Sequence, residues 1–250
     1  MKKLFLIAYL ILVTACQPAV NPPTSTATLP PSATATQTLI PVTDTPQPTA
    51  TPEFTPTPLP RFFTDEFDTS LTGWDILQAG SEATPGIRNE NSHLILQMDA
   101  PYNWVYAVYD AQDYGDIRLD ALFTNQAGSP ASIGLVCRYS ETEGWLEYNV
   151  STDGTYNLLY GSWLGDGIAN YLPITDGSSN LIQPSGAAQE IGLICSGTTA
   201  SLLVNQTVVR NIDVSRYELT NGKVGITASS FENVPVVAAF NWVRVSEPSP

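Results

Sequence analysis

The chain has 250 residues and a formal net charge of −14, from 24 acidic and 10 basic residues. This acidity argues against binding nucleic acid or anionic lipid headgroups, because both need a basic surface. His93 is the single histidine, which excludes metal sites built from several histidines and makes a Ser-His-Asp arrangement depend on one residue in a predicted strand.

Residues 1–15 have the layout of a secretory signal peptide: a positive start, an apolar run and small residues before Cys16. The run is too short for a membrane-spanning helix, which needs roughly 20 residues. Val13-Thr14-Ala15-Cys16 resembles the lipobox of bacterial lipoproteins. The resemblance implies cleavage before Cys16, acylation of that cysteine, and an extracytoplasmic protein held by lipid on the outer face of a bacterial membrane. The alternative is an ordinary signal peptide with a chance cysteine.

Residues 16–60 are predicted to form a disordered linker. Positions 17–60 contain 12 Pro and 12 Thr but no Gly, Lys or Arg. Such a tract cannot bury enough apolar surface to offset its ordering entropy, so it should sample extended polyproline-like shapes. All 17 Gly and all five Trp follow it. We therefore expect one folded domain over residues 61–250.

The domain is predicted to be all-β. Its apolar runs are short and rich in β-branched or aromatic residues, and no stretch of a dozen residues has a helical stripe. Turn-forming pairs separate the runs, for example Asp153-Gly154 and Ser196-Gly197. This pattern indicates two antiparallel sheets in a sandwich, or a barrel. The predicted strands are residues 93–98, 132–139, 145–150, 156–160, 190–195, 201–204 and 236–245.

Two strands echo each other and predict a disulfide. Residues 133–137 read Ile-Gly-Leu-Val-Cys and residues 191–195 read Ile-Gly-Leu-Ile-Cys. The period of two puts Ile, Leu and Cys on one inward face of each strand. With Cys16 lipidated, Cys137 and Cys195 are the remaining pair in an oxidising compartment. Two buried free thiols are the alternative.

Several motifs, in order, resemble the concanavalin A-like jelly rolls of bacterial surface proteins. This resemblance implies a two-sheet antiparallel jelly-roll sandwich whose first and last strands pair. The fold is shared by lectins, laminin-G-like modules, β-glucanases and 3-keto-disaccharide hydrolases, so it does not determine function. The motifs are Phe63-Thr64-Asp65-Glu66-Phe67 with Gly73-Trp74, Gly134 to Arg138, Trp145 to Val150, Asp153 to Tyr156, Leu203-Val204-Asn205, Gly222 to Ile226, and Phe240 to Val243.

The sequence gives little support for catalysis. The β-glucanases of this fold resemble one another in a strand of alternating carboxylates, and a retaining glycosidase needs two of them about 5–5.5 Å apart. Glu143 and Glu147 have suitable spacing, but Trp145 stands between them and Glu143 falls beside a turn glycine. Gly161 to Gly165 is not a nucleophile elbow, because its serine is misplaced. We expect no catalytic residue.

No cofactor is expected, and calcium is the one metal that the sequence suggests. Related jelly rolls hold calcium near the paired terminal strands, which makes Asp65 and Asn241 candidate ligands. Asp110, Asp113, Asp116 and Asp120 form a second acidic group, predicted to lie in a loop. None of the known calcium-loop spacings is met, so solvated acids are the preferred interpretation.

Strand alternation predicts a ligand-binding face. If Leu135, Cys137, Leu146 and Tyr148 face inward, other side chains project from the opposite face of the same sheet. There, flat aromatic rings beside an Arg and a carboxylate would suit a sugar. The alternative is that loops cover this face and that Trp163 packs beneath them. The candidate ligand-binding residues are Arg138, Trp145, Glu147 and Trp163.

Three functions follow from these patterns. The first is a non-catalytic, lipid-anchored cell-surface protein whose β-sandwich binds carbohydrate. The second is a glycoside or 3-keto-disaccharide hydrolase on the same fold, which needs paired carboxylates. The third is a structural or protein-interaction module. The expected partners are a membrane, through Cys16, and a glycan.

Overall fold

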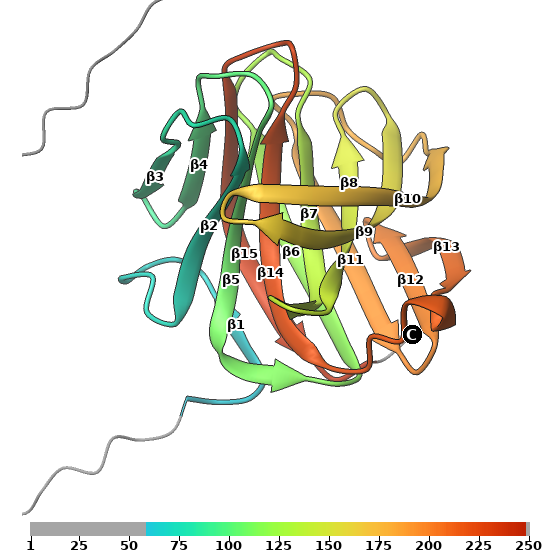
Figure 1. Cartoon of the computed structure of the whole chain (residues 1–250). Coiled ribbons are helices and arrows are strands. Elements are labelled where there is room, and N and C mark those ends of the chain that lie inside the picture. Colours follow the sequence, from blue (N-terminus) through green and yellow to red (C-terminus); the bar gives the residue numbers. More distant parts are fainter. Residues whose placement is uncertain (1–58, 249–250) are drawn as a thin grey trace, which may run out of the picture. The chain divides into compact units, whose positions relative to one another are not determined.

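The computed structural model describes residues 59–248, which form two antiparallel sheets packed face to face (Figure 1). The eight-stranded sheet has the order β13 (Thr207–Asp213), β12 (Thr199–Val204), β11 (Ala188–Ser196), β6 (Ile117–Asn125), β15 (Val236–Ser246), β4 (Leu94–Met98) and β3 (Gly86–Asn89), with β1 (Phe63–Asp65) paired to β15. The seven-stranded sheet has the order β10 (Ile168–Ser178), β9 (Thr155–Gly165), β8 (Gly144–Ser151), β7 (Ser132–Ser140), β14 (Gly222–Ser230), β5 (Asn103–Tyr114) and β2 (Trp74–Gly80).

The predicted two-sheet jelly-roll sandwich is thus confirmed. One short 3₁₀ helix, η1 (Ser215–Tyr217), precedes β14. In residues 59–248 there is no helix long and apolar enough to cross a membrane. The predicted signal peptide, Cys16 and the linker up to residue 58 lie outside the described residues.

Each of the seven predicted strands is present, and β1 and β14 (Gly222–Ser230) fall on two motifs of the resemblance. The six other strands were not predicted: β2, β3, β5, β6, β10 and β13. Strands β5 and β6 were not predicted because their acidic residues were assigned to a loop. Asp110 and Asp113 lie on the exposed end of β5, and Asp120 lies inside β6, so their assignment to a loop is wrong. Only Asp116 occupies the turn between the two strands.

The core between the sheets follows the predicted alternation. Leu135, Leu146 and Tyr148 point into it from the seven-stranded sheet and are buried. Cys137 of β7 and Cys195 of β11 are bonded across it, which confirms the disulfide and joins the two sheets. The chain-entropy model gives this link about 4 kcal/mol, because it closes a loop of 58 residues.

The first and last strands pair, as the resemblance implied. Phe63 lies opposite Val245 and Asp65 lies opposite Val243. The Asp65 carboxylate then organises the next turn, because it accepts bonds from the Phe67 backbone N–H and from the Trp74 indole, both at 2.8 Å.

The β9–β10 hairpin is the feature that positions the candidate site. In Figure 1 these two strands cross in front of the seven-stranded sheet. The tip of the hairpin reaches the opposite edge of that sheet, where the Gly80 N–H of β2 donates to the Gly167 carbonyl at 3.0 Å. The sheet therefore curls so that β10 meets β2 and its concave face is enclosed.

Candidate functional site: an aromatic layer and the groove beside it

Strand β8 places Trp145, Glu147 and Asn149 on the concave face, away from the sandwich core, as the period of two predicts. The prediction that this face is open is wrong. Trp145 and Glu147 are 0% and 1% exposed. The face is buried, as the alternative expected, but its cover is the β9–β10 hairpin rather than loops, and Trp163 is part of that cover.

The covered side chains form what we call the aromatic layer, defined as Trp104, Tyr106, Tyr139, Trp145, Trp163 and Tyr171. Trp145 is at its centre, with ring centroids 5.2 Å from Trp163 and 5.6 Å from Tyr106. Gly161 of β9 makes this packing possible, because a Cβ there would lie 2.2 Å from the Trp145 ring. The layer is a second, largely aromatic core.

Glu147 is buried inside this layer and is held by three neutral donors. The Tyr106 hydroxyl (3.0 Å) and the Trp145 indole (2.9 Å) donate to Oε2, and the Asn149 amide donates to Oε1 at 2.9 Å. Burial raises the pKa of Glu147, against the opposing effect of these hydrogen bonds. Burial also raises the pKa of Tyr106 well above its ordinary value, and Glu147 adds to that shift.

Glu143 and Glu147 do not form the carboxylate pair of a retaining glycosidase. Glu143 is exposed in the turn before β8, whereas Glu147 is enclosed. Trp145 occupies the alternating position between them. Among residues 59–248, the only hydrogen-bond partners of the Glu147 carboxylate are the three neutral donors.

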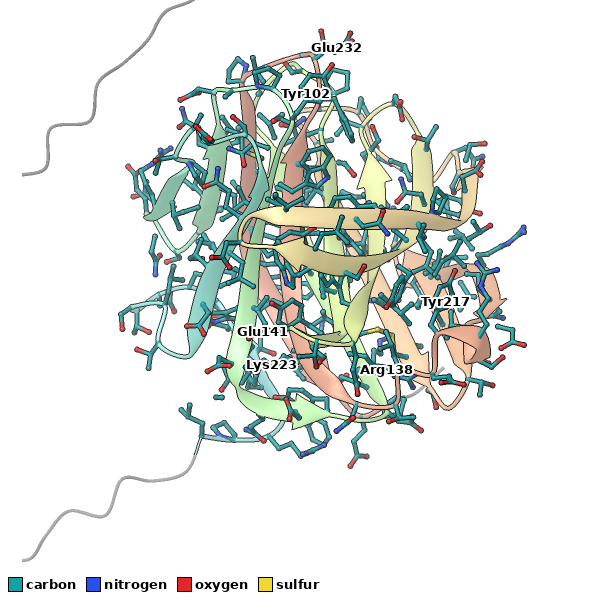
Figure 2. The ribbon with its side chains drawn as sticks, viewed as in Figure 1. Tyr102, Arg138, Glu141, Tyr217, Lys223 and Glu232 are labelled. Atoms are coloured by element: carbon teal, nitrogen blue, oxygen red, sulfur yellow. A yellow bond between two sulfur atoms is a disulfide. The ribbon has the colours of Figure 1, made fainter. Side chains whose placement is uncertain are left out.

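Arg138 does not lie on the concave face, so its predicted position is wrong. The strand register shifts between Cys137 and Ser140, and Arg138 takes a left-handed φ of 55° at this bulge. Its guanidinium instead donates to the carbonyls of Leu219 (2.6 Å) and Gly197 (2.8 Å). Figure 2 shows Arg138 at the lower edge of the sandwich. The bulge also turns Tyr139, the next residue, toward the aromatic layer.

An open groove lies where the hairpin tip meets the aromatic layer. It is a pocket of about 420 Å³ whose walls include Trp163 and Tyr139, with Gln78, Glu141 and Asp166 among its polar residues. The Trp163 indole donates to the Tyr139 hydroxyl at 2.9 Å, which fixes the two rings relative to each other. Of the four predicted ligand-binding residues, only Trp163 lines this groove.

Smaller pockets share wall residues with the groove. One of about 340 Å³ shares Tyr139 and Glu141 with it, and another of the same size shares Gln78 and Asp166. A fourth, of about 280 Å³, lies against Trp104 and Tyr171, whose rings stack with centroids 5.5 Å apart. The open surface therefore extends over several adjoining pockets. It has two aromatic pairs, Trp163 with Tyr139 and Trp104 with Tyr171.

The candidate calcium ligands contact protein groups, except that the Oδ1 atom of Asn241 is buried with no hydrogen-bond partner among the described residues. The Asp65 carboxylate holds the turn before β2, and the Asn241 amide contacts the His93 ring nitrogen at 3.0 Å. Asp116 accepts from the Gly197 N–H at 2.8 Å, and Asp120 pairs with Arg118. In the described chain, no three His, Cys, Asp or Glu residues gather as a metal site would require.

Sequence reasoning missed Tyr139, Glu141, Asp166 and Gln78. The turn Gly165-Asp166-Gly167 was a usable signal, because it separates two runs that a hairpin could join. Nothing local to the sequence indicated that this hairpin folds back over its own sheet.

A scan of protein-family models gives no match to the sequence, and a search of curated proteins gives none either. Solved structures do match the fold. A β-glucanase of Bacillus licheniformis is 14% identical with a TM-score of 0.52, over 75% of this chain and 98% of the glucanase. A protein of unknown function with a galectin-like fold from Bacillus subtilis is 13% identical with a TM-score of 0.54, over 74% and 94%.

A GH16 protein of Bacteroides ovatus, from a mixed-linkage glucan locus and solved with a G4G4G3G product, is 8% identical with a TM-score of 0.52. The match covers 74% of this chain and 99% of that protein. At such low identity these matches show the fold alone: a jelly-roll sandwich of the glucanase and galectin-like type.

Proposed function

We propose that this chain is a non-catalytic, extracytoplasmic protein that is anchored by lipid at Cys16 and binds carbohydrate in the groove at the tip of the β9–β10 hairpin. The observation that carries the proposal is the composition of the groove. It combines two fixed aromatic rings, Trp163 and Tyr139, with the polar side chains of Gln78, Glu141 and Asp166.

Those groups match the two requirements of sugar recognition. The faces of aromatic rings pack against the apolar face of a pyranose, and carboxylates or amides orient its hydroxyls. The Trp163–Tyr139 hydrogen bond restricts ring rotation, so less conformational entropy is lost when a ligand binds. The adjoining pockets extend the surface, which favours an oligosaccharide over a single sugar.

A glycan array tests the proposal directly. We expect the mature chain to bind at least one glycan class, and Trp163→Ala to weaken that binding at least tenfold, or about 1.4 kcal/mol. Trp242→Ala is the matched control, because Trp242 is a partly buried tryptophan on the eight-stranded sheet. Absence of binding to every glycan, or equal loss in both variants, would contradict the proposal.

Glycoside hydrolysis is a second candidate function, favoured by one observation. Burial raises the pKa of Glu147, and a carboxyl that keeps its proton is what a general acid needs. Against it, Glu147 is enclosed and has no carboxylate partner. Release of reducing sugar from polysaccharides by the native chain, abolished in Glu147→Gln, would favour hydrolysis over simple binding.

The lipid anchor has its own test. We expect the protein to incorporate a radiolabelled fatty acid when it is expressed in bacteria, and the Cys16→Ala variant to remain unlabelled and to be released from the membrane fraction. Cys16 carries this part of the proposal, because it ends the lipobox-like Val-Thr-Ala-Cys segment. Equal labelling of both proteins would contradict it.

A further inference from the structure

The groove and its adjoining pockets are lined by acidic residues. Glu141 and Asp166 face the main pocket, and Glu82, Asp113 and Glu143 line the pockets beside it. Glu141 and Asp166 thus add two acidic side chains to the pocket wall that also contains Trp163 and Tyr139.

Few cationic side chains line these pockets to balance the acidic ones. Lys223 is the single cationic residue that lines the four pockets described above, and its ammonium group is paired with Asp110. Figure 2 shows Lys223 below Glu141, at the same side of the sandwich. Within the described chain, Glu141 and Asp166 have no salt-bridge partner. The two carboxylates are thus available to a ligand.

The acidic side chains also affect the pKa of a hydroxyl group inside the groove. Burial raises the pKa of the Tyr139 hydroxyl, the hydrogen bond from Trp163 lowers it, and the charges of Glu141 and Asp75 raise it further. An anionic sugar would be repelled by the same charges. A cationic group would be attracted to them and also to the faces of the Trp163 and Tyr139 rings.

We propose that the groove prefers a glycan carrying free amino groups, such as a glucosamine oligomer, over neutral or anionic glycans. Trp163 stacks on a sugar ring while Glu141 and Asp166 each pair with an ammonium group of the chain. This inference rests on the proposed carbohydrate binding and specifies its ligand class. A glucosamine oligomer presents both the sugar rings and the ammonium groups that this wall could contact.

The test is calorimetric titration of the mature protein at low salt and at a pH where the amine is protonated. The probes are glucosamine, N-acetylglucosamine and glucose hexamers with the same linkage, and a lysine hexapeptide. We expect the glucosamine hexamer to bind at least tenfold more tightly than the other three. Added sodium chloride should reduce this preference, because both carboxylates are near solvent.

Charge-neutral variants assign the preference to the groove. Glu141→Gln together with Asp166→Asn should reduce the preference to about threefold or less, since an exposed ion pair contributes up to about fivefold in affinity. Glu66→Gln removes one charge from an exposed position near β1 and should leave the preference unchanged. Trp163→Ala should weaken all three hexamers, because it removes the stacking surface common to them.

Each remaining outcome overturns the inference in a recognisable way. If the neutral or acetylated hexamer binds as tightly as the glucosamine hexamer, and Trp163→Ala weakens both, carbohydrate binding stands and the amine preference fails. If the lysine hexapeptide binds as well as the glucosamine hexamer, the groove recognises positive charge rather than a sugar. If no hexamer binds, the proposed function fails together with the inference.

Discussion

The seven-stranded sheet buries both of its faces, and the two buried layers differ in kind. The layer between the sheets is mainly aliphatic, with the Cys137–Cys195 disulfide crossing it. The aromatic layer on the concave face is built from Trp and Tyr rings around the Glu147 carboxylate. The first layer is closed by a whole second sheet, whereas the second is closed by the β9–β10 hairpin.

The two layers therefore differ in role: the layer between the sheets stabilises the fold, and the aromatic layer also supplies residues to the proposed binding site. A core covered on all sides has no residue to offer a ligand. The aromatic layer ends at the hairpin tip, where Trp163 and Tyr139 pass from the packed interior to the wall of an open groove. The concave face that a jelly roll can use as a cleft is therefore filled here, and the surface available to a ligand is displaced to its rim.

The largest effect should come from the layer between the sheets. Replacing both Cys137 and Cys195 with Ala should lower the free energy of unfolding by about 4 kcal/mol, because the 58-residue loop is then no longer closed in the unfolded chain. Urea unfolding of the variant and of the reduced wild type should give similar midpoints. An unchanged midpoint in both would show that this link does not stabilise the sandwich.

A smaller effect should come from closing the space that Trp145 occupies. Gly161→Ala puts a Cβ within 2.2 Å of the Trp145 ring, so we expect a loss of about 1–3 kcal/mol of stability in urea unfolding. Gly165→Ala is the matched control on the same strand. No atom lies within 4 Å of its added Cβ, and the midpoint should barely move. Equal effects of the two would mean that the hairpin does not pack on Trp145.

The smallest effect should appear as a pH dependence. The pKa of Glu147 is raised in the folded protein, so above the ordinary carboxyl pKa of about 4.3 the folded state keeps a proton that the unfolded state loses. The free energy of unfolding then falls as pH rises through the window between those two pKa values. Glu147→Gln cannot titrate, so its stability relative to wild type should increase across that window and then level off.

Glu143→Gln provides the control for that titration, because Glu143 is exposed in the turn before β8. Its stability difference from wild type should stay nearly constant with pH. Denaturant unfolding at intervals from pH 4 upward is the measurement. A Glu147→Gln variant whose relative stability falls as pH rises would contradict the burial of a carboxyl in the aromatic layer.

The two layers also differ in how far the sequence could predict them. Alternation correctly placed Leu135, Cys137, Leu146 and Tyr148 between the sheets, because every inward position there is apolar. The same alternation placed Trp145 and Glu147 on the opposite face, but not beneath a cover. That face is buried by the β9–β10 hairpin, whose tip contacts β2 through Gly167 and Gly80, and no local pattern encodes this long-range contact.

Local backbone irregularity caused the remaining error. A period of two assumes a regular strand, and the bulge at Arg138 breaks it, so Arg138 leaves the concave face and Tyr139 joins it. Sequence alone gave no sign of the bulge, since Arg138 adopts a left-handed φ that favours Gly or Asn. Trp163 was found because the alternation in β9 continues as far as Trp163 and the register shift on the β9 side of the hairpin comes only after it.

Oxidative footprinting of tryptophan side chains, with and without the bound glycan, tests the central claim most directly. The account predicts that Trp145 is unreactive in both states, because it is fully buried, and that Trp163 is oxidised in the free protein and protected by the glycan. Oxidation of Trp145 in the free protein, with protection by the glycan and no change at Trp163, would contradict it.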